Sequence, residues 1–298
     1  MEHKFILSCC STADVPYAHM AERRISVLHY TYVVDGVEYE DDMGRDEASL
    51  PRFYEWIRQG KQPSTSQVSV GRYIEYFTEL LKQGDVLYLV FSSGMSGSAN
   101  NAALAAREVQ ESYPDRKIFV VDTLCGSSGQ ALFADMVADL RDAGATVEEA
   151  YTWAMENRGK VHHYFFSGDM TYFRRTGRVS GPAAAVATVL NICPLMRLDD
   201  KGAIKAYDKV RGKKATIKAL VDEMEAHAEG GSGYDGRCYL AHSMCPEDAA
   251  ATVSAIEERF PALKGKVLVS LIGPTIGSHT GIGTVSFYFF GDERKSVE

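Results

Sequence analysis

Residues 86–98 read Val86-Leu87-Tyr88-Leu89-Val90-Phe91 and then Ser92-Ser93-Gly94-Met95-Ser96-Gly97-Ser98. A short continuous apolar run that ends in a turn of small and hydroxyl residues is typical of a strand buried on both faces of a parallel sheet. A helical pattern follows from about Ser98 to Ser112, and a second strand pattern covers Lys117 to Val121. Strand, helix and strand in this order predict a βαβ unit, which places the chain in the α/β class.

The residues before this unit continue the alternation of strands and helices. Phe5 to Cys9 is a predicted first strand, and the spacing of apolar residues predicts helices over residues 50–57 and 70–81. Between them, the apolar run from Val27 to Val34 meets Asp35-Gly36 and then Val37-Glu38-Tyr39, which is a strong hairpin signal. We expect this hairpin to be an antiparallel addition to the main sheet.

Two further helical patterns complete the first half of the chain. One covers about Gly129 to Ala143, and Thr146 with Glu149 forms a capping-box pattern that opens the other, which runs to Asn157. Arg158-Gly159-Lys160 marks the predicted end of the first domain. We therefore expect an N-terminal domain over residues 1–160 with a parallel, Rossmann-like sheet.

Strands and helices mix differently after residue 160. Leu195 to Leu198 and Ala203 to Tyr207 form a predicted hairpin that turns on Asp199-Asp200-Lys201-Gly202. These patterns predict a C-terminal α+β domain over residues 161–298. The other predicted strands are residues 162–166, 237–241, 266–271 and 284–290, and the predicted helices are Ala183–Leu190, 213–227 and 246–259.

The composition is that of an ordinary globular protein and argues against several functions. The chain has 298 residues, with 40 acidic against 32 basic side chains and a formal net charge of −8, so it has no overall positive field to attract nucleic acid. Its longest apolar stretch, residues 181–196, is interrupted by Pro182, Asn191 and Pro194 and is too short to span a bilayer. The N-terminus shows no signal-peptide pattern, and we expect a cytoplasmic protein.

The spacing of cysteines and histidines shows no metal signature. The six cysteines have no Cys-x-x-Cys or Cys/His zinc spacing, so we interpret them as reduced thiols, with adjacent Cys9 and Cys10 on opposite faces of a strand end. His162 and His163 are also adjacent and would straddle a strand, which is a poor geometry for two ligands of one ion. We therefore predict no metal site.

Four turns rich in hydroxyl side chains or glycine are the candidate ligand sites. Two of them directly follow predicted parallel strands, where open α/β sheets bind ligands and where helix N-termini favour anions. We expect a single anionic group as the ligand; alternatively, the hydroxyl side chains only cap helices and the glycines only form turns. Phosphate-loop, dinucleotide-binding and nucleophile-elbow motifs do not occur in the sequence. The turns are residues 63–67, 92–98, 122–129 and 272–281.

His279 lies in the last of these turns among glycines, which let the backbone approach a ligand closely. An imidazole that titrates near neutrality can donate a hydrogen bond to an oxyanion, so His279 is a candidate binding residue. The alternative is an exposed loop histidine.

Seven segments of the chain carry a family resemblance. They are Ser11-Thr12-Ala13-Asp14-Val15-Pro16, Thr65-Ser66-Gln67, the turn at residues 92–98, Gly177-Arg178-Val179, Leu190-Asn191-Ile192-Cys193-Pro194, Lys209-Val210-Arg211-Gly212-Lys213-Lys214 and Ile276-Gly277-Ser278-His279-Thr280-Gly281. In this order they resemble the motifs of the DegV family of fatty-acid-binding proteins. The resemblance covers nearly the whole chain, and seven motifs in register are specific.

The resemblance implies a two-domain protein of the EDD fold that holds a long-chain fatty acid in a tunnel between its domains, without a cofactor. The family's carboxylate ligands map onto Thr65 and Ser96. The helix predicted at Ala183–Leu190 either lines such a tunnel or packs closely against another helix. The other candidate binding residues in the same turns are Ser66, Ser93, Gly97 and His279.

The resemblance also implies a partner. In family members that feed exogenous fatty acids into phospholipid synthesis, a dihydroxyacetone-kinase-like fatty acid kinase phosphorylates the bound carboxylate to an acyl phosphate. The family's histidine and arginine near the reacting group map onto His279 and Arg178, although Arg178, beside Arg174 and Arg175, is also interpretable as a surface ion-pair residue. The protein is then a lipid carrier without catalytic residues of its own. The alternative is an α/β enzyme that acts on a small phosphorylated or carboxylated metabolite.

Overall fold

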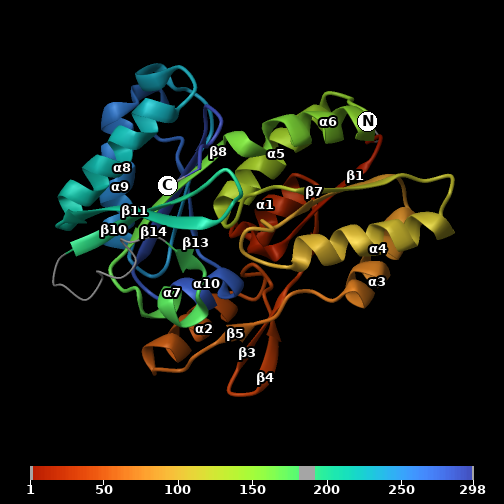
Figure 1. Cartoon of the computed structure of the whole chain (residues 1–298), viewed down its shortest axis with the longest axis horizontal. Coiled ribbons are helices and arrows are strands. Elements are labelled where there is room, and N and C mark those ends of the chain that lie inside the picture. The colour runs from red at the N-terminus through yellow and green to blue at the C-terminus, as the bar shows by residue number, and fades with distance from the viewer. Residues whose placement is uncertain (1–2, 181–191, 297–298) are drawn as a thin grey trace.

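The computed structural model describes residues 3–180 and 192–296, which form three β-sheets with helices packed between and around them (Figure 1). The helix predicted at Ala183–Leu190 lies outside the described residues. A parallel four-stranded sheet and a separate mixed sheet confirm the predicted α/β fold class. Within the described ranges, no helix is long and apolar enough to cross a membrane.

The first sheet is parallel throughout and has the strand order β2-β1-β6-β7. Its inner strand β6 is the apolar run that predicts the βαβ unit, and every residue from Val86 to Val90 is buried. Cys9 and Cys10 at the end of β1 face opposite sides of the sheet, because they belong to different hydrophobic clusters. The strands are β1 (Ile6–Cys10), β2 (Ser26–Leu28), β6 (Val86–Val90) and β7 (Ile118–Asp122).

Helices cover both faces of the first sheet (Figure 1). α3 and α4 pack against each other on one face, and α5 and α6 lie on the other. α3 buries Tyr73, Phe77 and Leu81, which recur at helical spacing, and the capping box of Thr146 and Glu149 opens α6 as predicted. These helices are α3 (Val70–Leu81), α4 (Ser98–Ser112), α5 (Ser128–Asp142) and α6 (Val147–Asn157).

The predicted hairpin forms, but it does not join the first sheet. Asp35 and Gly36 both have positive φ angles, of 51° and 81°, as the tight Asp-Gly turn requires. The chain leaves the first sheet after Leu28, where the N–H of Tyr30 donates to the side chain of Ser11 instead of a neighbouring strand. The hairpin pairs with β5 in a separate antiparallel sheet, so the expected addition to the main sheet is wrong. The strands of this sheet are β3 (Thr31–Val34), β4 (Val37–Glu40) and β5 (Ser64–Thr65).

The third sheet is mixed and has seven strands in the order β13-β12-β14-β8-β10-β11-β9. β10 and β11 form the hairpin predicted around residues 199–202, and both continue further from the turn than the sequence pattern indicates. α8 (Lys213–His227) and α9 (Pro246–Arg259) pack against this sheet (Figure 1). The strands are β8 (Val161–Ser167), β9 (Val179–Ser180), β10 (Ile192–Leu198), β11 (Ile204–Arg211), β12 (Cys238–His242), β13 (Leu268–Leu271) and β14 (Thr284–Phe290).

α5 lies between the two large sheets and is buried by both. It packs against β1 of the four-stranded sheet and against β12 and β14 of the seven-stranded sheet. Four consecutive residues, Ala131-Leu132-Phe133-Ala134, are buried, which happens when a helix has protein on every side. One hydrophobic cluster therefore joins Leu89 of β6, α5 and Tyr288 of β14.

Short helices complete the fold and include one correction. The glycine-rich turn predicted at residues 272–281 is mostly helix α10, which starts with Pro274 at its first position, where a missing N–H costs no helix hydrogen bond. α10 packs against α7, a helix that the sequence patterns do not indicate. The short helices are α1 (Tyr17–Glu22), α2 (Ser49–Arg58), α7 (Thr171–Thr176) and α10 (Pro274–Thr280), and the 3₁₀ turns are η1 (Ser11–Ala13), η2 (Arg158–Lys160), η4 (Gly231–Gly233) and η5 (Pro261–Leu263).

Candidate functional site

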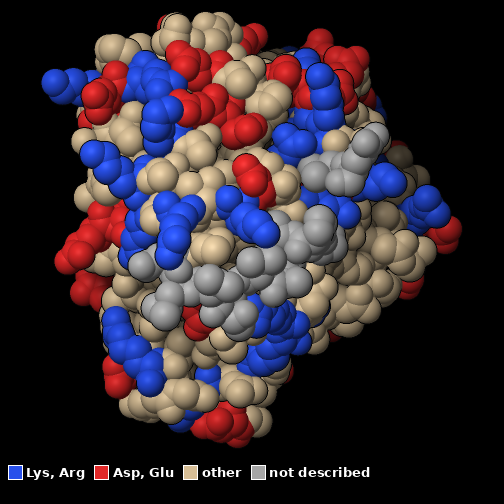
Figure 2. Space-filling view, turned by 60° about the vertical axis from the view of Figure 1, so that its left-hand side comes forward, with Lys and Arg blue, Asp and Glu red and all other residues tan. Residues whose placement is uncertain are grey.

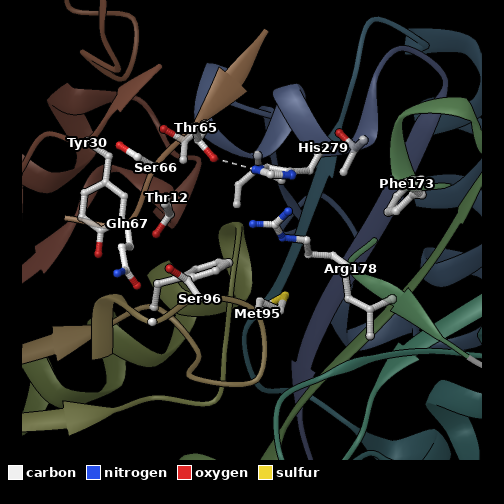
Figure 3. Close-up of a pocket in the computed structure, with 16 residues that line it drawn as sticks. Thr12, Tyr30, Thr65, Ser66, Gln67, Met95, Ser96, Phe173, Arg178 and His279 are labelled. Atoms are coloured by element: carbon white, nitrogen blue, oxygen red, sulfur yellow. Dashed lines mark hydrogen bonds between the residues drawn. The ribbon is translucent and has the colours of Figure 1, made fainter. Parts of the chain in front are cut away.

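A cavity of about 310 Å³ lies where β5, the loop after β6, α7 and α10 meet (Figure 3). Three of the four candidate turns supply lining residues: those at residues 63–67, 92–98 and 272–281. The hydroxyl groups of the fourth turn bond inside the fold, since Thr123 donates to a backbone carbonyl of β6 and Ser127 donates to a buried carboxylate. Segments from both halves of the chain therefore meet at one site.

Thr65 reaches the cavity because β5 pairs with β3. The pairing sets Thr65 opposite Tyr32 at the edge of the small sheet, which packs against α10. Its hydroxyl oxygen Oγ1 is 2.7 Å from Nε2 of His279, and this hydrogen bond joins the two halves of the chain (Figure 3). Ser66 lines the cavity next to Thr65.

His279 is a largely buried, neutral side chain of α10. Burial and the nearby charges of Arg178 and Arg175 lower the pKa of its imidazole to about 4, so the expectation that it titrates near neutrality is wrong. The alternative of an exposed loop histidine is also wrong, because the residue belongs to a helix and lines the cavity. Its second ring nitrogen, Nδ1, is buried and has no hydrogen-bond partner among the described residues. This nitrogen is therefore an unused hydrogen-bonding position beside the cavity.

Ser96 lies at the N-terminus of α4. Its Oγ accepts a hydrogen bond from the N–H of Ser98 at 3.2 Å and donates to Ser98 Oγ at 3.1 Å. Gly97 fits here because a Cβ at this position would overlap the side-chain oxygen of Gln67. The first turn of a helix of 15 residues has N–H groups without helical partners and favours negative charge. An anion is therefore the ligand that this part of the cavity suits.

Ser93 does not reach the cavity with the other predicted binding residues. It is exposed, and its N–H donates to the Asp122 carboxylate at 3.1 Å. Five of the predicted binding residues do line the cavity, namely Thr65, Ser66, Ser96, Gly97 and His279.

Arg178 lines the cavity and is also exposed to solvent, so it lies at the cavity mouth. Figure 3 shows its guanidinium group turned toward His279. Its neighbour Arg175 has a different role, because it donates to the carbonyls of Pro63 and Ser278 at 2.8 and 3.0 Å and so ties α7 to the segments before β5 and within α10. Of the two arginines, Arg175 of α7 therefore holds the helix in place, whereas Arg178, just after α7, lines the cavity.

One side of the cavity wall is apolar. Phe91, Met95, Phe173, Ile204 and Ile276 line it, and the same residues also line an adjoining smaller cavity of about 60 Å³. The smaller cavity extends toward the seven-stranded sheet, where side chains of β8 and β10 contribute further apolar walls. Polar groups on one side and apolar walls on the other suit a ligand with an anionic head and an apolar body.

Ten of the lining residues were not among the sequence candidates, and Thr12, Tyr30, Gln67 and Phe173 are four of them. Thr12 and Gln67 stand inside motifs of the family resemblance, which is the signal that could have found them. The Tyr30 hydroxyl bonds to a tyrosine of α3 at 2.8 Å, and this contact depends on the tertiary fold. Phe173 belongs to α7, whose short sequence has no periodic pattern, so local reasoning could not place it.

Neither the buried cysteine thiols nor Ser96 are arranged for nucleophilic catalysis. All six cysteines lie in the described ranges and are free, as predicted. Burial raises the pKa of the thiols of Cys125 and Cys238 to about 12, which disfavours the nucleophilic thiolate. Ser96 bonds to another serine, and His279 bonds to a threonine, so the cavity does not pair Ser96 with a basic imidazole.

Comparison with known proteins identifies the family. Residues 10–292 match the family described as "Uncharacterised protein, DegV family". The chain belongs to the DegV family. The membership inferred from seven short motifs is therefore confirmed.

The relatives of this DegV protein match it over nearly its full length. A DegV domain-containing protein of Clostridium perfringens is 36% identical over 293 residues, which is 98% of this chain and 99% of the relative. A Thermotoga maritima protein named fatty acid-binding protein is 32% identical over 294 residues, with 96% and 97% covered. The crystal structure of a DegV lipid-binding protein from Thermotoga maritima superposes with a TM-score of 0.83 at 28% identity, over 98% of this chain and 100% of the other.

Proposed function

We propose that this DegV protein binds one long-chain fatty acid, with the carboxylate against Thr65 and Ser96 and the tail along the apolar walls of the cavity. The observation that carries the proposal is the presence of unused polar atoms beside an apolar surface. Thr280 Oγ1 belongs to a cavity-lining residue, is buried, and has no hydrogen-bond partner within the described part of the chain. When Nε2–H of the neutral His279 donates to Thr65 Oγ1, the hydroxyl proton of Thr65 is also left for a ligand oxygen. A buried polar atom without a partner costs free energy, and a ligand oxygen removes this cost. Relatives named as fatty-acid-binding and lipid-binding proteins support the same ligand class.

The polar side of the cavity offers hydrogen-bond donors to a carboxylate. Thr65 and Ser96 each contribute a hydroxyl group, that of Ser96 by turning from Ser98 Oγ toward the ligand, and the N-terminus of α4 adds a partial positive charge. Arg178 contributes a full positive charge at the mouth. Hydrogen bonds to an ionised acceptor are roughly twice as strong as neutral ones. Because His279 is neutral, the attraction for the buried carboxylate comes from the hydroxyl donors and the N-terminus of α4, while the charge of the exposed Arg178 is screened by solvent.

The tail supplies the larger part of the binding free energy. At about 0.8 kcal/mol per buried CH₂, a sixteen-carbon chain contributes on the order of 12 kcal/mol before association and ordering costs. Affinity should therefore rise with chain length until the apolar space is filled.

Two measurements test this function. Denaturing extraction of the purified protein, followed by mass spectrometry, should release a long-chain fatty acid. Calorimetry on the delipidated protein should then show that palmitate binds more tightly than octanoate. Equal affinities would contradict the proposal, and an empty site with turnover of a soluble metabolite would favour an α/β enzyme instead.

We further propose that the protein works in the cytoplasm and presents the bound carboxylate to a dihydroxyacetone-kinase-like fatty acid kinase. Arg178 supports this step because it reaches both the cavity and solvent. Phosphorylation of a carboxylate brings two anions together, and a guanidinium at the mouth offsets their repulsion. Figure 2 shows Lys and Arg side chains across the middle of the side that lies at the left in Figure 1, where β11 carries the exposed residues Lys209 and Arg211. A basic face suits a partner with an acidic surface.

Arginine variants test the presentation step. Arg178→Ala should bind fatty acid nearly as tightly as wild type but lose most acyl phosphate formation with a cognate kinase. Arg174→Ala is the matched control, because Arg174 is an exposed arginine of α7, four residues before Arg178 and outside the cavity lining, and it should keep both activities. His279→Ala should weaken both. Full acyl phosphate formation by folded Arg178→Ala would show that this arginine has no part in transfer.

A further inference from the structure

Three side chains with metal-binding atoms converge away from the fatty-acid cavity. They are His162 of β8, His227 at the end of α8 and Asp292 just after β14, and none of them lines the cavity. One ligand atom of each lies within 4.8 Å of the other two. His162 Nε2 is 3.0 Å from Asp292 Oδ1, and His227 Nδ1 is 3.1 Å from the same oxygen.

These separations suit a single ion. Zinc binds imidazole nitrogen and carboxylate oxygen at about 2.0 to 2.2 Å, so tetrahedral ligand atoms lie roughly 3.3 Å apart. The two nitrogen–oxygen distances are within a few tenths of an ångström of that value. An ion also requires His162 Nε2 to leave the Asp292 carbonyl at 3.0 Å, and the stacked rings of His162 and His227 to turn so that both nitrogens point at it. Three protein ligands that include imidazole and carboxylate, with a fourth position open, are a recognised zinc coordination set.

The backbone brings the three groups together without the ion. The Asp292 N–H donates to the carbonyl of His227 at 3.0 Å, which fixes the segment after β14 against the end of α8. Gly291 permits this approach, because a Cβ there would overlap the His227 carbonyl and lie 3.2 Å from the ring of His162. The His162 ring stacks on Phe289 with ring centres 5.0 Å apart, so its direction is fixed as well. A site built in advance loses little conformational entropy when it binds an ion.

The charges around the cluster are mixed. A carboxylate oxygen of Glu223 is 3.6 Å from the other ring nitrogen of His227, in the position of the outer carboxylate that orients many metal-bound histidines. The nearby guanidinium of Arg294 opposes a cation, since the bond from its Nη2 to the carbonyl of Leu124 at 2.9 Å does not remove its charge.

A cavity of about 300 Å³ adjoins the cluster and offers room for water as a further ligand. His162, His227 and Glu293 line it together with Arg197, Arg294 and Lys295, and the three basic side chains oppose a cation. His162 and His163 do straddle β8, as the sequence indicates, and they do not share a site. The partners of His162 come instead from 65 and 130 residues further along the chain, which sequence spacing does not show.

We propose that this DegV protein has a zinc site formed by His162, His227 and Asp292, separate from the fatty-acid site. A bound ion links β8, α8 and the segment after β14, so its role is to stabilise the fold. The proposal does not depend on the identity of the lipid.

Zinc titration of the untagged, metal-free, full-length chain tests the site. A chromogenic zinc chelator in competition should report one ion per chain, and zinc should raise the melting temperature. His227→Gln and Asp292→Asn each remove one ligand and should weaken zinc binding by about tenfold or more. His3→Gln is the matched control, because His3 lies near the carboxylate of Asp142 and outside the three-residue cluster. This variant should bind zinc like wild type.

Fatty-acid affinity is the second readout. Both ligand variants should bind palmitate like wild type, which shows that the fold is intact and that zinc loss is local. Wild-type protein that does not bind zinc one to one would overturn the site. Unchanged zinc affinity in either folded ligand variant would do so too, and the two histidines would then only hold Asp292 by hydrogen bonds.

Discussion

Thr65→Val removes one hydroxyl group from the carboxylate site and keeps the β-branched shape that β5 accommodates. A hydrogen bond to an ionised acceptor contributes about 1.5 to 3 kcal/mol, which corresponds to about ten- to 150-fold in affinity. The Thr65 hydroxyl accepts from the imidazole of His279 at 2.7 Å and donates its own proton to the ligand. The bond between Thr65 and His279 is therefore lost from the free and the bound variant alike. That loss therefore cancels in the affinity and is expected instead in the free energy of unfolding, at about 1 kcal/mol.

Isothermal titration of the delipidated protein with palmitate measures the first quantity, and urea unfolding measures the second. Ser93→Ala is the matched control, since this serine belongs to a candidate turn but is exposed and bonds through its backbone only to Asp122. It should leave both values unchanged. If folded Thr65→Val binds palmitate as tightly as wild type, the carboxylate does not lie against β5 and the assignment of the polar end is refuted.

Three other variants are predicted to have measurable effects. Ser96→Ala should weaken palmitate binding by about tenfold, because a second hydroxyl donor is lost, and calorimetry with the same control checks this. Burial raises the pKa of Asp41 to about 6, whereas a value near 3.9 is expected in the unfolded chain. The folded state therefore holds the Asp41 proton more tightly, and the stability that this proton contributes is lost as pH rises from about 4 to 7. Asp41→Asn should reduce that loss in urea titrations at the two pH values, and an unchanged pH dependence would contradict the burial argument. Asp135 is buried and accepts hydrogen bonds from Arg23 and Tyr239. Asp135→Ala should therefore lower the free energy of unfolding by about 3 kcal/mol. A loss below about 1 kcal/mol would mean that the two donors find other partners.

Features set by neighbouring residues could be predicted from the sequence. The capping box of Thr146 and Glu149, the Asp35-Gly36 turn and the buried strand at Val86–Val90 each depend on a few adjacent side chains, and each forms as predicted. The position of the hairpin could not be predicted in the same way. It depends on the bond between Tyr30 and Ser11, which lie on different elements.

The candidate site shows the same division. Thr65 and Ser96 were identified because family motifs mark them, and the structure brings both to one cavity. The state of His279 was mispredicted because its pKa depends on burial and on Arg178, and neither is visible from the glycines around it. Ser93 is a candidate because it shares a turn with Ser96, but positions three residues apart in a tight turn point in different directions.

The burial of α5 by both large sheets limits how a lipid can enter. Hinge opening between the two halves would strip one face of the helix and expose Tyr239 and Tyr288 together with the packed segment around Phe133. Exposing that much apolar surface costs far more than local movement of a short element. We therefore expect the halves to unfold in a single cooperative transition. Passage of the fatty acid then depends on small displacements near the cavity mouth, where α7 is six residues long and β5 only two.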